Sequence, residues 1–279
     1  MLYLFLAILS SSLISIFMRL SEGRIRSNAG LFIFNYAACV VLSAVYMPKG
    51  TLAAWAPGSR ISMGLGILTG FFLLLAFFVF KKNIAQNGIV LSSIFMKLGV
   101  LVPVLISIIC FGETPTFLQL IGIVVAVAAI IVFHFEKTDL KRKAGLFGLL
   151  VLLLLTGGMG EAMMNIYNKV GSAKLKDLFL LVAFISACGF SLILFFAKRE
   201  KMNGMEILFG ILVGIPNYFS SRFQLLALQE IPAVIVYPVF SVGTILLISI
   251  AGIVFFKEKF TKQKAAGLIL VLVALALLH

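Results

Sequence analysis

Two charged residues lie inside long apolar stretches of the chain. Lys97 lies about ten residues into the apolar run 88–111, with no acidic residue within one helical turn, and Glu161 ends a glycine-rich segment in the run 145–168. A charged side chain at mid-depth in a bilayer costs roughly 2.5–3.5 kcal/mol or more unless it is paired or hydrated, so each predicts a functional site. We expect Lys97 to hold an anionic group and Glu161 to bind a cationic group or to carry a coupling proton. The alternative is a buried ion pair between the two that only fixes one helix against another.

Polar residues in other apolar runs extend this candidate site. Pro216 frees a backbone carbonyl one turn earlier in its helix, next to Asn217 and Tyr218. Arg222 lies closer to the end of the same run, where extension of its side chain to lipid headgroups is favoured over a site role. The remaining predicted lining residues are Ser11, Asn165 and Tyr237.

The elements that must position these residues are membrane-spanning helices. The chain is 62% hydrophobic and 12% charged, with a mean hydropathy of +1.18, whereas soluble domains are about half apolar and about a quarter charged. Apolar runs of roughly 20 residues are long enough to cross a bilayer core of about 30 Å. We therefore predict an all-α integral membrane protein with ten transmembrane helices, at about 2–19, 29–47, 61–80, 88–111, 116–135, 145–168, 177–197, 205–226, 231–256 and 263–278.

Several functional classes do not fit this sequence. The net charge of +13 comes from basic residues in short loops, which topology and anionic lipids explain, so we expect no nucleic-acid partner. The three cysteines and two histidines are isolated, so we expect no metal, no cofactor and no enzyme active site. The N-terminus has no charged region and no cleavage site, so the first run is expected to be a retained helix.

The distribution of basic residues predicts an orientation. Of the 23 Lys and Arg residues, 16 lie in loops on one side of the ten predicted spans and six lie on the opposite side. The remaining one is Lys97, inside a span. The six are Lys49, Arg60, Lys169, Lys174, Lys176 and Arg222. The positive-inside rule places the 16-residue side in the cytoplasm and both termini outside, in a multi-pass protein of the cell (inner) membrane.

The sequence also contains an internal repeat. Residues 111–122 and 256–267 share the pattern F-x-E-x-x-T-x-x-x-x-x-G, and the pair Gly66 and Gly70 recurs as Gly210 and Gly214. The pattern predicts a first five-helix repeat at 1–136, a basic linker loop at 137–144 and a second repeat at 145–279. Because each repeat has an odd number of spans, the two are inverted, an arrangement that supports alternating access.

Residues within the repeat have predicted structural roles. The glycine pairs favour close helix packing, Thr116 and Gln119 form a capping box, and Glu113 is expected to be structural. The repeat maps Glu161 onto Ser11 and Lys97 onto Val242. Specificity is therefore expected at these asymmetric positions.

These helix ends, together with the segment Ala227–Ala233 and the pair Tyr237-Pro238, resemble the drug/metabolite transporter superfamily, specifically its EamA-type ten-helix transporters. The resemblance covers essentially the whole chain. It implies a central cavity lined by the first, third, fourth, sixth, eighth and ninth helices. It also implies transport of small metabolites, and cytoplasmic termini in place of the outward termini that the charge count predicts.

Together these features predict a secondary active transporter. It would move a small polar metabolite, amino-acid-like or another zwitterion or organic ion, across the membrane by alternating access. The alternative is a lipid-carrier or headgroup flippase of the same fold. The expected partners are a small-molecule substrate and bilayer lipid, with proton or exchange coupling and a homodimer left open.

Overall fold

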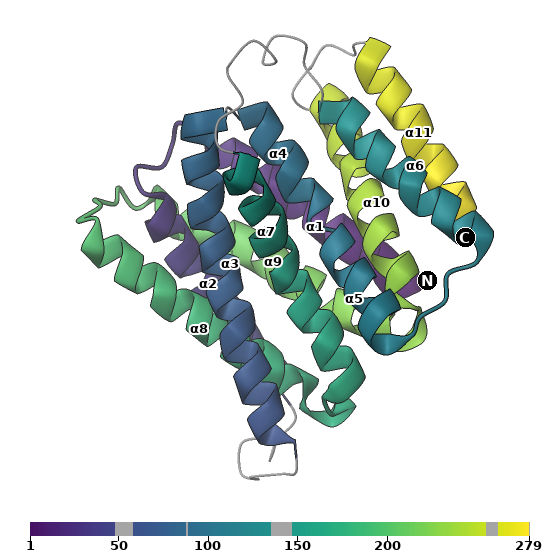
Figure 1. The fold of residues 1–279 in the computed structure, drawn as a ribbon. Helices are drawn as coiled ribbons and strands as arrows, with labels where there is room; N and C mark the ends of the chain where they lie inside the picture. Colours follow the sequence, from purple (N-terminus) through teal and green to yellow (C-terminus); the bar gives the residue numbers. More distant parts are fainter. Residues whose placement is uncertain (48–57, 88, 135–146, 255–261, 279) are drawn as a thin grey trace. The chain divides into compact units, whose positions relative to one another are not determined.

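The structure is a computed structural model that describes residues 1–47, 58–87, 89–134, 147–254 and 262–278 (Figure 1). The predicted linker 137–144 lies outside the described residues, as does the F-x-E-x-x-T part of the second repeat at 256–261. Within these ranges the secondary structure is entirely helical, which confirms the predicted all-α class. The helices are α1 (Leu2–Ser21), α2 (Asn28–Tyr46), α3 (Ser59–Asn87), α4 (Ile89–Leu98), α5 (Leu101–Phe111), α6 (Phe117–His134), α7 (Phe147–Val170), the 3-10 turn η2 (Ala173–Leu175), α8 (Lys176–Ala197), α9 (Met205–Glu230), α10 (Ala233–Val254) and α11 (Lys262–Leu278).

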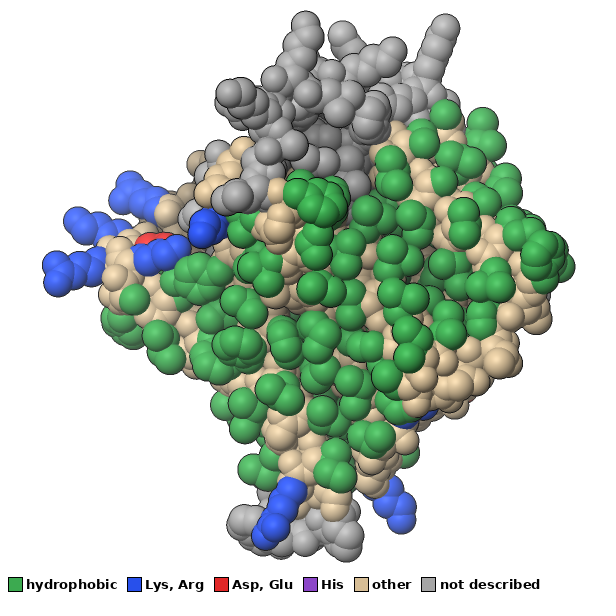
Figure 2. Space-filling model, viewed as in Figure 1, with side chains coloured by type: hydrophobic (Ala, Val, Ile, Leu, Met, Phe, Trp, Pro, Cys, Tyr) green, Lys and Arg blue, Asp and Glu red, His purple; other side chains and the backbone are tan. Residues whose placement is uncertain are grey.

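Length and composition support the membrane prediction. Six helical segments are long and apolar enough to cross a bilayer, and shorter apolar helices include 95–111, 117–132 and 269–278. Many large hydrophobic side chains are exposed, such as Ile109, Val124 and Ile193, and hydrophobic side chains cover most of the face shown in Figure 2. Lipid tails solvate such a surface, whereas water does not. The integral membrane class is thus confirmed, while the count of ten spans stays a prediction.

The predicted fourth run is not one uninterrupted helix. The backbone turns at Gly99 and Val100, between α4 and α5. Pro103 has no N–H to donate to the carbonyl of Gly99 four residues earlier, and its ring would clash with that oxygen in a regular helix. The N–H of Val102 donates to the Gly99 carbonyl instead, over 2.9 Å, and the N–H of Val100 donates to that of Lys97 over 3.3 Å. The tighter turn places Lys97 in the last turn of α4, where the carbonyl end of the helix favours a positive charge.

The described chain divides into two compact units. The first consists of residues 1–74 and 163–230, and the second of 75–162 and 231–279 within the described limits. Each unit therefore contains segments from both predicted repeats.

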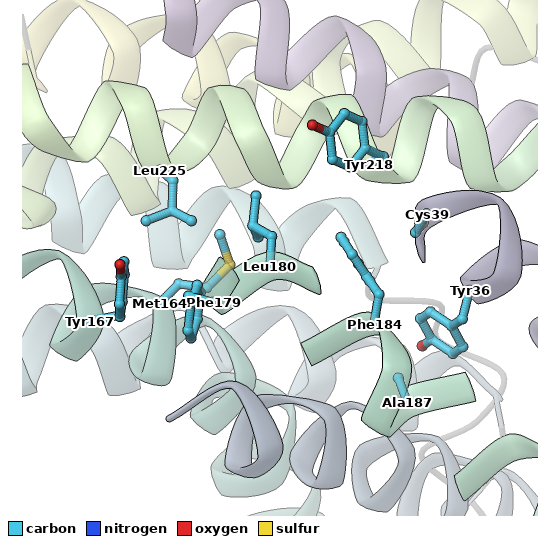
Figure 3. Close-up of a cluster of buried hydrophobic side chains, with 10 residues drawn as sticks. All are labelled: Tyr36, Cys39, Met164, Tyr167, Phe179, Leu180, Phe184, Ala187, Tyr218 and Leu225. Atoms are coloured by element: carbon cyan, nitrogen blue, oxygen red, sulfur yellow. The ribbon is translucent and has the colours of Figure 1, made fainter. Parts of the chain in front are cut away.

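In the first unit, α2 packs on α8 and α9, and α1 packs on α9. Its core holds ten buried residues, drawn in Figure 3. Among them the rings of Tyr167 and Phe179 stack with centroids 4.1 Å apart, and Figure 3 shows Tyr218 of α9 on the same cluster. In the second unit, α6 packs on α11, and α10 contacts α5, α6 and α11.

The repeated glycines lie where helices approach closely. A β-carbon at Gly66 would lie 2.9 Å from the carbonyl oxygen of Phe179 in α8, and one at Gly70 would lie 2.7 Å from that of Ala183. Gly210 and Gly214 make the same kind of contact with α2, where a β-carbon at Gly214 would lie 2.8 Å from Cβ of Ala38. The packing role predicted for both pairs is confirmed.

Carboxylates accept hydrogen bonds from the backbone at helix ends in two places. Glu113 accepts a hydrogen bond from the backbone N–H of Val234 in the first turn of α10, at 3.1 Å, which supports the structural role predicted for it. The side chain of Glu206 is fully buried and accepts from the N–H groups of Arg26, Ser27 and Asn203 at 2.7, 3.0 and 2.9 Å. The predicted capping box is also present, because Thr116 and Gln119 each accept from the other's backbone N–H.

Candidate functional site

The second unit contains a small polar pocket that holds both isolated charges. Its lining comes from the α4–α5 junction, α7 and α10, and its volume is about 130 Å³. The lining residues are Met96, Lys97, Gly99, Val100, Gly157, Glu161, Phe240, Ser241 and Thr244. Such a volume is smaller than drug-sized pockets of roughly 300–1,000 Å³, so it suits a small metabolite or the polar group of a larger one.

Lys97 and Glu161 share this pocket without forming an ion pair. Both side chains are partly exposed, and each acts electrostatically on the other. Among the described residues, however, no contact within 4.0 Å joins the ammonium to the carboxylate. The two opposite charges therefore face the same pocket without direct ion-pair contact.

Close backbone packing fixes the separation of the two charges. Gly158 of α7 lies against Gly99, and a β-carbon at Gly99 would come within 2.9 Å of the Gly158 nitrogen. These two glycines lie two and three residues from Lys97 and Glu161, so their contact sets how closely the two elements carrying the charges approach. Gly158 therefore serves close packing between α7 and the α4–α5 junction.

Tyr237 positions the Glu161 end of the pocket. Its side chain is fully buried in α10, and its hydroxyl donates a hydrogen bond of 2.7 Å to the backbone carbonyl of Glu161. A carbonyl bonded in this way ties α7 to α10 at the position of the carboxylate. The structure thus brings Tyr237 to the pair Lys97 and Glu161, although its hydroxyl acts on the backbone of the site.

Sequence reasoning missed Thr244. Its side chain is 1% exposed, it lines the pocket, and its hydroxyl has no hydrogen-bond partner within the described part of the chain. A usable signal existed, since Tyr237, Ser241 and Thr244 are spaced i, i+4 and i+7 and so share one face of α10. Hydropathy alone gave no reason to single out a threonine in an apolar run.

The other predicted site residues lie in the first unit. Asn217 donates through its side-chain amide to the amide oxygen of Asn35 in α2, at 3.1 Å. Asn165 is fully buried in α7, and Ser11 is partly exposed in α1. These side chains are therefore not part of the described lining of the Lys97 pocket.

Arg222 has a protein partner that the sequence did not reveal. Its Nη1 atom donates to Oδ1 of Asp177 at 2.5 Å and to the hydroxyl of Tyr218 at 2.6 Å, and its guanidinium lies 5.1 Å from the ring centroid of Tyr46. The side chains of Arg222 and Asp177 are 19% and 5% exposed. The guanidinium is thus held by α8 and α9, in place of the extension to lipid headgroups that its position favoured, because Asp177 provides a nearby anionic partner.

The first unit also contains an apolar groove between α1 and α9. Its volume is about 500 Å³. The lining residues are Ser10, Leu13, Phe17, Leu212, Ile215, Pro216, Phe219 and Phe223. Apart from one serine this lining is apolar, so the groove suits a hydrocarbon chain and not a polar metabolite.

The fold and the polar pocket define a multi-pass α-helical membrane protein with opposite charges inside its helical region. Comparison with known proteins extends this class to a family. Residues 148–279 match the sequence profile of the EamA-like transporter family. This match confirms the expected resemblance to the drug/metabolite transporter superfamily over that segment. Members of the family are membrane transporters and not enzymes.

Two further comparisons cover nearly the whole chain. The chain is 26% identical over 287 residues to a curated protein of Haemophilus influenzae (strain ATCC 51907 / DSM 11121 / KW20 / Rd), named "Uncharacterized protein". The alignment covers 99% of this chain and 97% of that relative. A solved structure described as "Crystal structure of protein" has a TM-score of 0.74 at 14% identity, covering 99% of this chain and 94% of that one. At that identity the structural likeness supports the fold alone.

Proposed function

We propose that the protein is a secondary active transporter of a small zwitterionic metabolite, with the substrate held between Lys97 and Glu161. The observation that carries the proposal is that these two charges share one pocket but do not pair. Taking an ammonium and a carboxylate out of water costs several kcal/mol for each ion, and direct pairing would recover part of this cost. A ligand that carries both charges recovers it in the same way when it enters the pocket.

The two charges differ in what they offer a substrate. The ammonium of Lys97 donates three hydrogen bonds and suits a carboxylate or another small anion. The carboxylate of Glu161 accepts hydrogen bonds and suits a protonated amine, or it binds a coupling proton when the site is empty. An α-amino acid carries both groups on its α-carbon, and this compact arrangement matches a pocket of about 130 Å³.

Alternating access between two inverted repeats is part of the proposal. It is supported by the helix contacts at the repeated glycines, where α3 packs on α8 and α9 packs on α2. The third and eighth predicted spans contain α3 and α9, and the second and seventh contain α2 and α8. If the third span corresponds to the eighth and the second to the seventh, these two contacts are equivalent. The predicted location in the cell (inner) membrane and the orientation with 16 basic residues inside belong to the same proposal.

Uptake into proteoliposomes tests this function. The purified protein would be reconstituted and supplied with radiolabelled glycine, L-alanine, L-serine, other amino acids and polyamines, with protein-free liposomes as the background. We expect at least one zwitterion to be accumulated by the wild type, and Lys97→Ala and Glu161→Gln to reduce its uptake at least tenfold without loss of folded protein. Uptake by both variants at the wild-type rate would contradict the assigned roles.

A lipid flippase is a second candidate function, favoured by the apolar groove between α1 and α9. A hydrocarbon chain in this groove would let the protein move a lipid. Fluorescent phospholipids in the same proteoliposomes distinguish the two functions, because a flippase changes their distribution between leaflets and a metabolite transporter does not.

A further inference from the structure

We propose that Thr244 is a specificity-determining residue, whose hydroxyl donates a hydrogen bond to the anionic group of the substrate beside Lys97. The inference rests on the proposed function and adds a residue and a selectivity to it. The substrate class becomes small carboxylates that also carry an amino group, preferred over their neutral amides.

The first support is the state of the Thr244 hydroxyl. A buried hydroxyl is normally hydrogen-bonded, and in a helix a threonine usually donates to the carbonyl four residues earlier. The other intrahelical threonines behave in this way, as Thr69 donates to the Leu65 carbonyl and Thr156 to that of Leu152, both at 2.8 Å. The hydroxyl of Thr244 has no partner within the described part of the chain. Its hydrogen-bonding capacity is therefore available to a ligand.

The second support is the position of Thr244. It lines the same pocket as Lys97 and Glu161, and Ser241, one turn earlier on α10, adds a second hydroxyl to that wall. A carboxylate has about four acceptor sites on its two oxygens, so an ammonium alone does not satisfy it. A hydroxyl beside the ammonium provides the additional donor that a desolvated carboxylate requires.

The third support is the asymmetry between the two predicted repeats. At the 145-residue offset Thr244 corresponds to Gly99 and Lys97 corresponds to Val242. Each repeat thus contributes one hydrogen-bonding side chain at a position where the other has none. Selectivity built from both repeats follows from this pattern.

Binding to purified protein tests the inference with two variants at the same position. Thr244→Val removes the hydroxyl and keeps the branched shape, and Thr244→Ser keeps a hydroxyl. Isothermal titration with the transported zwitterion, here L-alanine, should give an affinity about 10- to 100-fold weaker for the valine variant, from the strength of a hydrogen bond to a charged group. The serine variant should bind within a few-fold of wild type. L-alaninamide, which lacks the carboxylate, should bind both variants and wild type equally weakly.

Thermal unfolding of the empty protein separates this role from a structural one. Because Thr244→Val removes a buried hydroxyl without a partner, it should keep or raise the melting temperature while it weakens binding. A lower melting temperature with unchanged affinity would show a structural role and overturn the inference. Wild-type protein that binds zwitterions, with a valine variant that binds them equally well, would also overturn it and leave the proposed function intact. If wild type binds and transports no zwitterion, the proposed function fails and the inference fails with it.

Discussion

The contact between Gly158 and Gly99 sets the separation of the two charges, and the substitution Gly158→Ala tests it. A β-carbon at position 158 would overlap the carbonyl oxygen of Gly99 and lie 2.7 Å from Cβ of Val102. Ordinary contacts of a β-carbon begin at 3.4 Å. To lengthen the 2.7 Å contact with Val102 to this value, α7 and the α4–α5 junction must move apart by at least 0.7 Å. The obstructing atom at Gly99 is backbone, which cannot move aside as the end of a flexible side chain can.

The expected cost follows from this geometry. Overpacking a well-packed site costs typically about 1–3 kcal/mol, and sometimes more when backbone must shift. Alanine also favours a helix by about 1 kcal/mol relative to glycine. Subtracting this gain from the overpacking cost leaves an expected net loss of up to about 2 kcal/mol. Widening the pocket should weaken substrate uptake as well.

A matched control lies in the same helix. Gly148 of α7 is exposed, and a β-carbon there meets nothing within 4 Å. Gly148→Ala should therefore be neutral or slightly stabilising. The assay is the thermal unfolding midpoint of both variants in the same detergent, followed by uptake in proteoliposomes. If Gly158→Ala were as stable as Gly148→Ala and transported equally well, the close contact would not determine the geometry of the site.

Two further predictions concern buried charges outside the pocket. Arg222→Ala should destabilise the protein by about 2–3 kcal/mol because it leaves the largely buried Asp177 carboxylate without its cation. Arg222→Lys should recover part of this loss. Unfolding in mixed micelles measures both variants, and an alanine variant as stable as wild type would contradict the structural role. Glu206→Gln should lower the free energy of unfolding by about 1–3 kcal/mol. Both carboxylate oxygens of Glu206 accept from backbone N–H groups, and the amide nitrogen of glutamine cannot accept a hydrogen bond. As a control, Glu22→Gln at an exposed position should have no effect on the melting temperature.

Hydropathy predicted the helices well because a bilayer imposes a simple length and composition on each span. The first two predicted runs agree with α1 and α2 to within two residues at each end. The break within the fourth run was missed, although Pro103 is visible in the sequence. A window average counts proline only by its polarity and ignores the N–H that it lacks.

The candidate site was predicted in part. Lys97 and Glu161 were identified because charge is costly in a membrane, whatever the fold of the chain. The sequence could not show whether the two pair, since that depends on the contact between Gly99 and Gly158. Arg222 was harder, because its partner Asp177 is 45 residues away and becomes a neighbour only when α8 and α9 pack.

Thr244 could not be predicted from the sequence for a different reason. A threonine in an apolar helix normally bonds to its own backbone, so its residue type carries no signal. Its significance depends on a hydroxyl that is buried, lines a pocket and lacks a partner in the described structure, and all three are properties of packing.

A structure of the protein with a transported zwitterion bound would test the central claim most directly. We predict that the ligand occupies the pocket between the α4–α5 junction, α7 and α10, with its amino group at Glu161 and its carboxylate at Lys97 and Thr244. A ligand found outside this pocket, with Lys97 and Glu161 in direct contact within ion-pair distance, would contradict the account.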